Sequence, residues 1–380
     1  MRVIFRVDSS FEIGTGHVMR CLVLAKILKE NNSNVEFICR QHQGHLVNKI
    51  RLNGFNVYEL DSLEKVPVNN ALPYSHMLGT TQNQDANDCI RLLKNKKIDW
   101  LIVDHYAIDE EWQIKLNPYY KKLMVIDDLA NRNHRCDILL DQTFGRELED
   151  YSGLTPKYCN LLLGSKYALL RTEFFEWRDY SLKRRINPKF NQLLVNMGGF
   201  DASNVTGRIV RELQTCTLPN EITITIVMSA KSPHLKDVLI AVDELPYKSE
   251  ILLDVDNMAE IMANADIAIG ASGSSSLERC CMGLPSIQIV VASNQIFLAQ
   301  MLATHNIVKL LTEFNEIGCF LEDTAKWMKR ASDLASNICD GKGGHKVFNT
   351  LSEYKIVLNK FGEVELCNYI NLNNNDKIFV

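Results

Sequence analysis

The sequence predicts an α/β protein made of two Rossmann-like domains that face a cleft. The chain has 380 residues, a length that fits two domains at roughly 100–200 residues each. Short apolar runs rich in Val, Ile, Leu and Phe alternate with longer segments of helical period, which is typical of βαβ units and a parallel sheet. This alternation stops near residue 173 and restarts near residue 190, which indicates two such units in tandem.

The composition narrows the class of protein. Lys and Arg number 42 against 46 Asp and Glu, a formal net charge of −4, so the basic surface needed for sequence-independent nucleic-acid binding is not expected. Apolar residues at 46% and charged residues at 23% are near the average of globular proteins, which argues against disorder. We expect a compact protein without a nucleic-acid partner. The sequence sets no oligomeric state, and a monomer is compatible with it.

Cysteine spacing and hydropathy give further expectations. The 11 cysteines form no CxxC pair, so the spacing of zinc ribbons and thioredoxin-like sites is missing. No carboxylate cluster suggests a metal, and we expect neither metal nor cofactor. No stretch approaches the roughly 18 apolar residues of a membrane span, and the first apolar run is too short for a signal-peptide core. We therefore expect a cytoplasmic protein without a membrane partner.

The first domain is expected over residues 1–172. A helix is predicted over residues 17–29, where Val18, Cys21, Leu22, Ala25 and Leu28 form one apolar stripe that would pack on a sheet. Seven apolar runs are the candidate strands, at residues 3–7, 35–39, 56–60, 100–104, 123–127, 138–140 and 160–163.

The second domain is expected over residues 190–345. The preceding residues 173–189 are rich in charged and aromatic side chains without a strand pattern, and we assign them to a linker. Five candidate strands follow, at residues 192–196, 223–228, 250–253, 266–269 and 286–291. Residues 346–380 are less regular and form an extension to which the sequence assigns no role.

The loop between the first strand and the first helix is the first candidate site. Gly14 and Gly16 would let a ligand approach the backbone, but Met19 stands where a dinucleotide fingerprint needs its third glycine. His17 starts the helix, where the macrodipole disfavours imidazolium, so a neutral ring could act as a general base. A capping or packing histidine is the alternative. Arg20 either faces the same cleft or makes a surface ion pair.

Polar residues also follow two later strands. Asp104 and Tyr106 end one strand, and Asp127 and Asp128 end the next. In open α/β sheets such ends converge on the ligand-binding edge. Each aspartate taken alone is nevertheless more typical of a helix cap or a loop.

Two glycine-containing loops in the second half favour a nucleotide site. Gly198 and Gly199 follow the first strand of that half and could cradle a phosphate. The other loop has hydroxyls and N–H groups suited to a diphosphate, and it consists of Ser272, Gly273, Ser274 and Ser275. Glu278, one turn further on, could bind ribose hydroxyls. Alternatively, Ser274 is only a helix cap and Glu278 an exposed residue. Asn294 and Gln295 would reach the same cleft and could contact a sugar.

These motifs together resemble a known family, the UDP-2,4-diacetamido-2,4,6-trideoxy-β-L-altropyranose hydrolases of pseudaminic acid biosynthesis. The residues that carry the resemblance are FRVDSS (5–10), GTGHVMR (14–20), DHY (104–106), DD (127–128), CDILLDQ (136–142), YALLRTEF (167–174), MGG (197–199), ASGS (271–274) and Glu278. The resemblance spans about residues 1–340. Ala107 departs from it where glycine often follows the DHY motif, and residues after about 345 have no counterpart.

The resemblance implies a glycosyltransferase-B fold related to the N-acetylglucosaminyltransferase that makes lipid II, with water as the acceptor. It implies that His17 is the catalytic base, that Tyr106 and Asn294 are active-site polar groups, and that the glycine loops and Glu278 bind UDP. The substrate would be a UDP-sugar hydrolysed with inversion at the anomeric carbon. A true UDP-sugar glycosyltransferase and a non-catalytic nucleotide-sugar binding protein remain the alternatives.

Overall fold

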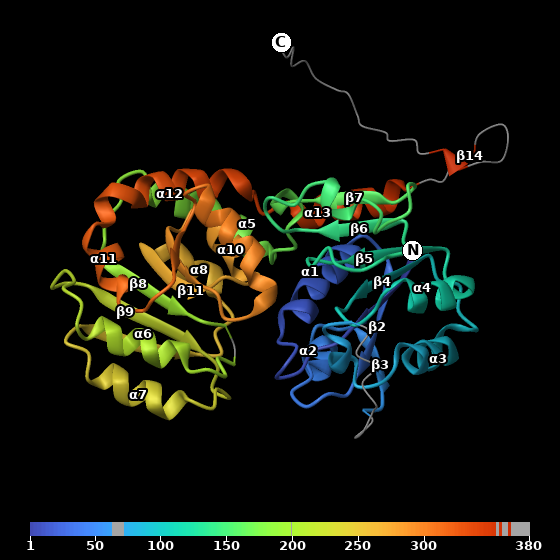
Figure 1. The fold of residues 1–380 in the computed structure, drawn as a ribbon, viewed down its shortest axis with the longest axis horizontal. Coiled ribbons are helices and arrows are strands. Elements are labelled where there is room, and N and C mark those ends of the chain that lie inside the picture. Colours follow the sequence, from blue (N-terminus) through green and yellow to red (C-terminus); the bar gives the residue numbers. More distant parts are fainter. Residues whose placement is uncertain (63–71, 199, 355–356, 359–363, 366–380) are drawn as a thin grey trace, which may run out of the picture.

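The computed structural model describes residues 1–62, 72–198, 200–354, 357–358 and 364–365. Two parallel sheets form the centres of two α/β domains that lie side by side (Figure 1). The predicted fold class is thereby confirmed. Within these residues, none of the helices has the length and apolar character needed to cross a membrane.

The first sheet has seven strands in the order β3-β2-β1-β4-β5-β6-β7, and every adjacent pair is parallel. Its strands are β1 (Arg2–Val7), β2 (Asn34–Arg40), β3 (Asn56–Leu60), β4 (Trp100–Asp104), β5 (Lys122–Ile126), β6 (Ile138–Asp141) and β7 (Asn160–Leu163). All seven predicted strands are present. Most of them read as continuous apolar runs because helices cover both faces of a parallel sheet.

The second sheet has six strands in the order β10-β9-β8-β11-β12-β13. They are β8 (Gln192–Asn196), β9 (Thr223–Met228), β10 (Lys248–Leu253), β11 (Ile267–Ala271), β12 (Ser286–Ile289) and β13 (Lys309–Leu311). The sequence predicted the first five. It missed β13 because three residues are too short to show a strand pattern. A separate pair, β14 (Val357–Leu358) and β15 (Val364–Glu365), lies near the C-terminus.

The helices flank these sheets. They are α1 (Gly16–Glu30), α2 (Val47–Leu52), α3 (Gln82–Leu93), α4 (Glu110–Leu116), α5 (Thr172–Arg184), α6 (Val205–Leu213), α7 (Leu235–Asp243), α8 (Met258–Asn264), α9 (Ser275–Cys281), α10 (Ile296–Thr304), α11 (Glu316–Glu322), α12 (Thr324–Ile338) and α13 (Gly343–Glu353). In the first domain α1, α2 and α13 pack in the apolar cluster on one face of the sheet. Helices α3 and α4 belong to the cluster on the other face.

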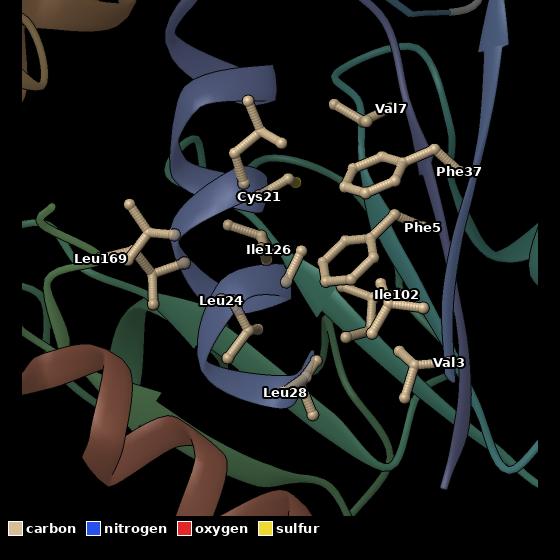
Figure 2. Close-up of a cluster of buried hydrophobic side chains, with 14 of the residues drawn as sticks. Val3, Phe5, Val7, Cys21, Leu24, Leu28, Phe37, Ile102, Ile126 and Leu169 are labelled. Atoms are coloured by element: carbon tan, nitrogen blue, oxygen red, sulfur yellow. The ribbon is translucent and has the colours of Figure 1, made fainter. Parts of the chain in front are cut away.

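Helix α1 carries the predicted apolar stripe. Figure 2 shows Cys21, Leu24 and Leu28 directed toward Phe5 and Phe37 of the sheet. More of the helix is buried than one stripe accounts for, and Val23 and Ile27 are also buried. Helix α13 packs against these two residues. A Cβ placed on its Gly344 would lie 2.6 Å from Ile27 Cδ1.

The chain passes between the domains twice. The predicted linker forms α5, which packs against α8 and α9 of the second domain. After α12 the chain returns, and α13 places Val347 and Leu351 in the core of the first domain. The expected boundary at residue 345 falls inside α13. The extension without an assigned role thus begins with residues that complete the first domain's core.

Candidate active site

The loop from β1 to α1 places His17 beside the end of β4. Strands β1 and β4 are parallel neighbours, with Val7 paired to Asp104, so their carboxyl ends lie together. Gly14 adopts φ +79°, and its N–H donates to the Ser10 carbonyl at 2.9 Å, which closes a tight turn before the helix. His17 is then the second residue of α1, at the helix start that the sequence indicated.

Asp104 binds the His17 ring directly. Nδ1 of His17 lies 2.6 Å from Oδ1 of Asp104, and the His17 side chain is 8% exposed. Burial by itself would raise the pKa of Asp104, but the adjacent Arg20 guanidinium and the hydrogen bonds from Arg20 and His17 outweigh it and hold that pKa well below its usual range. An ionised Asp104 accepts the Nδ1 proton, which leaves the Nε2 lone pair as the acceptor of the ring. The geometry suits a general base oriented by a carboxylate.

Arg20 forms a buried ion pair. Its Nε donates to Asp104 Oδ2 at 2.6 Å, its Nη2 to Asp104 Oδ1 at 2.7 Å, and its Nη1 to Asp128 Oδ2 at 2.8 Å. Arg20 is 7% exposed, so the surface alternative from the sequence is wrong. The guanidinium is engaged by two carboxylates of the first domain, and this arrangement makes it a support for Asp104 and His17.

Tyr106 and Asn294 meet across the domain interface. Asn294 Nδ2 donates to Tyr106 Oη at 3.1 Å, and the Tyr106 ring packs edge-on against His17 with centroids 4.6 Å apart. Burial, together with the nearby Asp128 carboxylate, raises the pKa of Tyr106 well above its usual value, so its hydroxyl keeps its proton. Two of the residues proposed from the sequence for the same cleft are therefore in direct contact, although they are 188 positions apart.

The serine and glycine loop before α9 faces the first domain. A Cβ placed on Gly16 would lie 3.7 Å from Ser274 Oγ, and one placed on Gly273 would lie 3.4 Å from Gln295 Nε2. Ser274 is at the N-cap position of α9, but its side chain makes no capping hydrogen bond. Ser272 Oγ is buried without a hydrogen-bond partner among the described residues. The loop therefore keeps hydroxyl groups that local structure does not use.

Glu278 and Arg279 follow this loop on α9. Burial raises the pKa of Glu278, whose Oε1 lies 3.9 Å from Arg171 Nη2. Arg279 is 1% exposed and donates to the Ala271 carbonyl at 2.6 Å. Among the described residues it forms no ion pair with a carboxylate within 4.0 Å. Although burial lowers the pKa of Arg279 to about 10, its positive charge is retained at neutral pH beneath the loop.

The second glycine loop is described in part. Gly198 is exposed and has φ +93°, a conformation that favours glycine. Gly199 lies outside the described residues. Phe200 stacks on Phe11 of the first domain with ring centroids 4.5 Å apart, so this loop also meets the loop that precedes His17.

Several site residues were not identified from the sequence. The ring centroids of Tyr74 and Tyr106 are 5.2 Å apart, and the Tyr74 hydroxyl is 3.1 Å from Ser293 Oγ of the other domain. Asp104 and Asp128 were considered more typical of structural roles. Their common position at the ends of adjacent strands had placed them at the expected ligand-binding edge, since Asp104 ends β4 and Asp128 follows β5, but it did not show that they bind His17 and Arg20. Among the described residues, no group of three or more His, Cys, Asp or Glu is arranged to hold a metal ion.

Comparison with known proteins identifies the family. No family model matches the sequence. The chain is 32% identical over 305 residues to the UDP-2,4-diacetamido-2,4,6-trideoxy-beta-L-altropyranose hydrolase of Campylobacter jejuni, covering 80% of this chain and 96% of that protein. The chain belongs to this hydrolase family. The family resemblance predicted from the motifs is thereby confirmed.

Solved structures extend the comparison to the fold of the chain. MurG of Acinetobacter baumannii superposes with a TM-score of 0.66 at 14% identity, over 93% of this chain and 99% of that chain. A UDP-GlcNAc 2-epimerase of Neisseria meningitidis, solved with UDP-GlcNAc, gives a TM-score of 0.59 at 10% identity, over 93% of this chain and all of that chain. At these identities the likeness establishes the fold alone. The glycosyltransferase-B architecture with two Rossmann-like domains is confirmed for this family member.

Proposed function

We propose that the protein hydrolyses a UDP-linked 2,4-diacetamido-2,4,6-trideoxyhexose to UDP and the free sugar, in pseudaminic acid biosynthesis. Family membership supports a UDP-sugar hydrolase. The observation that carries the proposal is the buried His17–Asp104 pair, held by Arg20 and placed next to the contact between Tyr106 and Asn294. A protein that only binds a nucleotide sugar has no need for an oriented base at this position.

The proposed reaction is a single displacement. Nε2 of His17 accepts a proton from water as the water oxygen bonds to the anomeric carbon, and the bond from that carbon to the UDP oxygen breaks with its electron pair leaving on UDP. Asp104 stabilises the imidazolium that forms. The sugar leaves with inverted anomeric configuration, and no covalent intermediate arises. UDP is a good leaving group, so this mechanism needs no strong general acid.

The second domain is proposed to hold UDP. Backbone N–H groups of Gly273, Ser274 and Ser275 in the serine and glycine loop, and of Gly198 in the other loop, would bind the diphosphate as its negative charge grows. The buried charge of Arg279 lies beneath the first of these loops and favours an anion there. Glu278 would bind the ribose hydroxyls, and Gln295, next to Gly273, would contact the sugar.

The first domain is proposed to hold water and sugar. The Tyr106 ring packs against His17, Asn294 of the second domain donates to the Tyr106 hydroxyl, and both side chains would hydrogen-bond to the substrate. Gly14 and Gly16 would permit close approach of the sugar to the backbone. Arg20, for which the sequence offered a place in the cleft as a substrate-binding residue or a surface ion pair, is proposed instead to fix Asp104, because its donors face two carboxylates.

The experiment incubates the protein with the UDP-linked trideoxy sugar, without any acceptor, and follows UDP and free sugar by NMR. The expected result is UDP release that His17→Ala abolishes while UDP affinity is retained. His345→Ala is the matched control, because His345 is an exposed histidine on α13. Absence of release, or release that requires an added acceptor, would refute the hydrolase and support a transferase. Equal activity of wild type and His17→Ala would refute the role of His17.

The nucleotide site has a separate test. Glu278→Ala should weaken UDP binding in calorimetry because the ribose hydroxyls lose their acceptor. Glu260→Ala is the control, since Glu260 lies on α8 and faces Asn257 and not the serine loop. Unchanged UDP affinity in Glu278→Ala would contradict the ribose role and leave the hydrolytic mechanism in place.

A further inference from the structure

A second interdomain contact lies next to the candidate active site and involves helix α10. Arg146, in the loop after β6, places its guanidinium carbon 4.2 Å from the centre of the Phe297 ring on α10. The Arg146 side chain is only 5% exposed. Beside it, Gly145 has φ +84°, and a Cβ there would lie 2.4 Å from Met301 Cε on the same helix. The loop and the helix are thus packed without room for a larger residue at Gly145.

The first domain fixes the orientation of the Arg146 guanidinium. Nε donates to Asp141 Oδ2 at 2.6 Å, and Nη2 donates to the Asp128 carbonyl at 3.0 Å. Nη1 lies 3.6 Å from Asp150. Asp141 is itself held by the Tyr151 hydroxyl, which donates at 2.9 Å. With its donors engaged in this way, the guanidinium lies over the Phe297 ring. A lysine ammonium could also approach the ring, but it could not keep the same fork of hydrogen bonds at the same time.

Both ends of this contact reach the site residues. Phe297 is three positions after Asn294, and α10 begins directly after the short 3-10 turn η5 (Ser293–Gln295) that carries Asn294. On the other side, Asp128 offers its carbonyl to Arg146 and its carboxylate to Arg20. A shift of α10 against the first domain would therefore move Asn294 relative to Tyr106 and His17.

We propose that Arg146 is a positioning residue that, by stacking on Phe297, fixes the start of α10 and so holds Asn294 at Tyr106. This inference rests on the proposed function, because it assigns Arg146 a kinetic effect through Asn294. Arg146 makes no contact with the His17–Asp104 pair. Its influence on the reaction passes through the geometry of the interface.

The test compares Arg146→Gln, Arg146→Lys and Phe297→Leu with wild type in the UDP-release assay. A displacement of about 1 Å near a reacting centre can lower the rate by about 100-fold, so we expect kcat to fall by about 10- to 100-fold in all three. UDP affinity should stay within about twofold, because the nucleotide loops are elsewhere. Leu148→Ala is the control, since Leu148 is in the same segment, is 64% exposed, and should behave as wild type.

A double-mutant cycle tests the route through Asn294. If Arg146 acts by holding Asn294, Arg146→Gln combined with Asn294→Ala should be no slower than Asn294→Ala alone. Independent, multiplied losses would overturn the inference, as would wild-type kcat in Arg146→Lys or Phe297→Leu. Loss of kcat in His17→Ala with wild-type activity in Arg146→Gln would refute only this inference. Full activity in both His17→Ala and Asn294→Ala would refute the roles proposed for those two residues, and absence of UDP release by the wild type would refute the proposed function.

Discussion

Replacing Asp104 with Asn tests the dyad most directly. Asp104 accepts hydrogen bonds from His17 Nδ1 and from two nitrogens of Arg20, at distances of 2.6 to 2.7 Å. The substitution keeps the shape of the side chain and removes its charge. An Asn amide can place its NH₂ group toward His17, which would make Nδ1 the acceptor and put the proton on Nε2. In that tautomer Nε2 cannot take a proton from water.

The expected magnitude follows from the role of the base. General-base catalysis typically contributes about 10²- to 10⁴-fold, and each tenfold corresponds to about 1.4 kcal/mol of activation free energy. We therefore expect Asp104→Asn to lower kcat by about 10²- to 10⁴-fold, which corresponds to about 3 to 5.5 kcal/mol. The pKa of Asp104 lies well below its usual range, so a wild-type enzyme retains this carboxylate in ionised form throughout the physiological pH range.

The assay is UDP release at saturating substrate, with UDP affinity and the thermal midpoint measured on the same preparations. Asp127→Asn is the matched control. Asp127 is equally buried and is paired with Arg132 at 2.7 Å, but none of its described polar partners is His17, Arg20 or Tyr106. Both variants should lose stability, and only Asp104→Asn should lose catalysis. A folded Asp104→Asn protein with kcat within about threefold of wild type would refute the reasoning.

Two predictions concern stability. Burial lowers the pKa of His134 to about 4 from roughly 6.5 in an unfolded chain, so acidification through this window protonates only the unfolded state and removes up to about 3 kcal/mol of stability. His134→Asn, which keeps an acceptor for the Gln113 amide, should flatten that pH dependence in urea unfolding, and an unchanged slope would contradict the assignment. Gly343→Ala should cost about 1–3 kcal/mol, because the new Cβ would lie 2.3 Å from the Ala168 carbonyl oxygen. Gly318→Ala, with 3.6 Å to Cys216 Sγ, is its control in thermal unfolding, and equal behaviour of the two would contradict the packing argument.

The fold was largely predictable because both sheets are parallel and covered by helices. Strands of this kind read as short apolar runs, and the intervening helices separate them clearly. The run at residues 100–104 illustrates this, since every residue of β4 is buried. Strand β13 was missed because it spans only Lys309–Leu311. The order of the strands within each sheet was not predictable in the same way. For example, β4 pairs with β1 although it lies about a hundred residues later in the chain.

The site was predictable where one segment carries its own signal. A glycine loop that opens a helix placed His17 at the helix start, and the structure brings Tyr106 and Asn294 together as polar residues of one interface. The partners of His17 were not predictable from local pattern, because Asp104 is 87 positions away. Arg146 carries no sequence signal at all. Its significance depends on which surface of α10 faces the first domain.

The last helix changes how the two domains are to be understood. His17 is held by α1, and α1 is packed by the sheet on one side and by α13 on the other. Gly343 allows α13 to approach the backbone of Ala168 at a distance that a Cβ would prevent, and Gly344 lies close to the Ile27 side chain. The segment after residue 340 therefore supports the helix that carries the proposed base, although in the chain it follows the half that is proposed to bind UDP. A motion of one domain relative to the other would have to bend the chain at both places where it passes between them, before α5 and before α13. A hinge at the single linker of residues 173–189 would leave the second crossing strained.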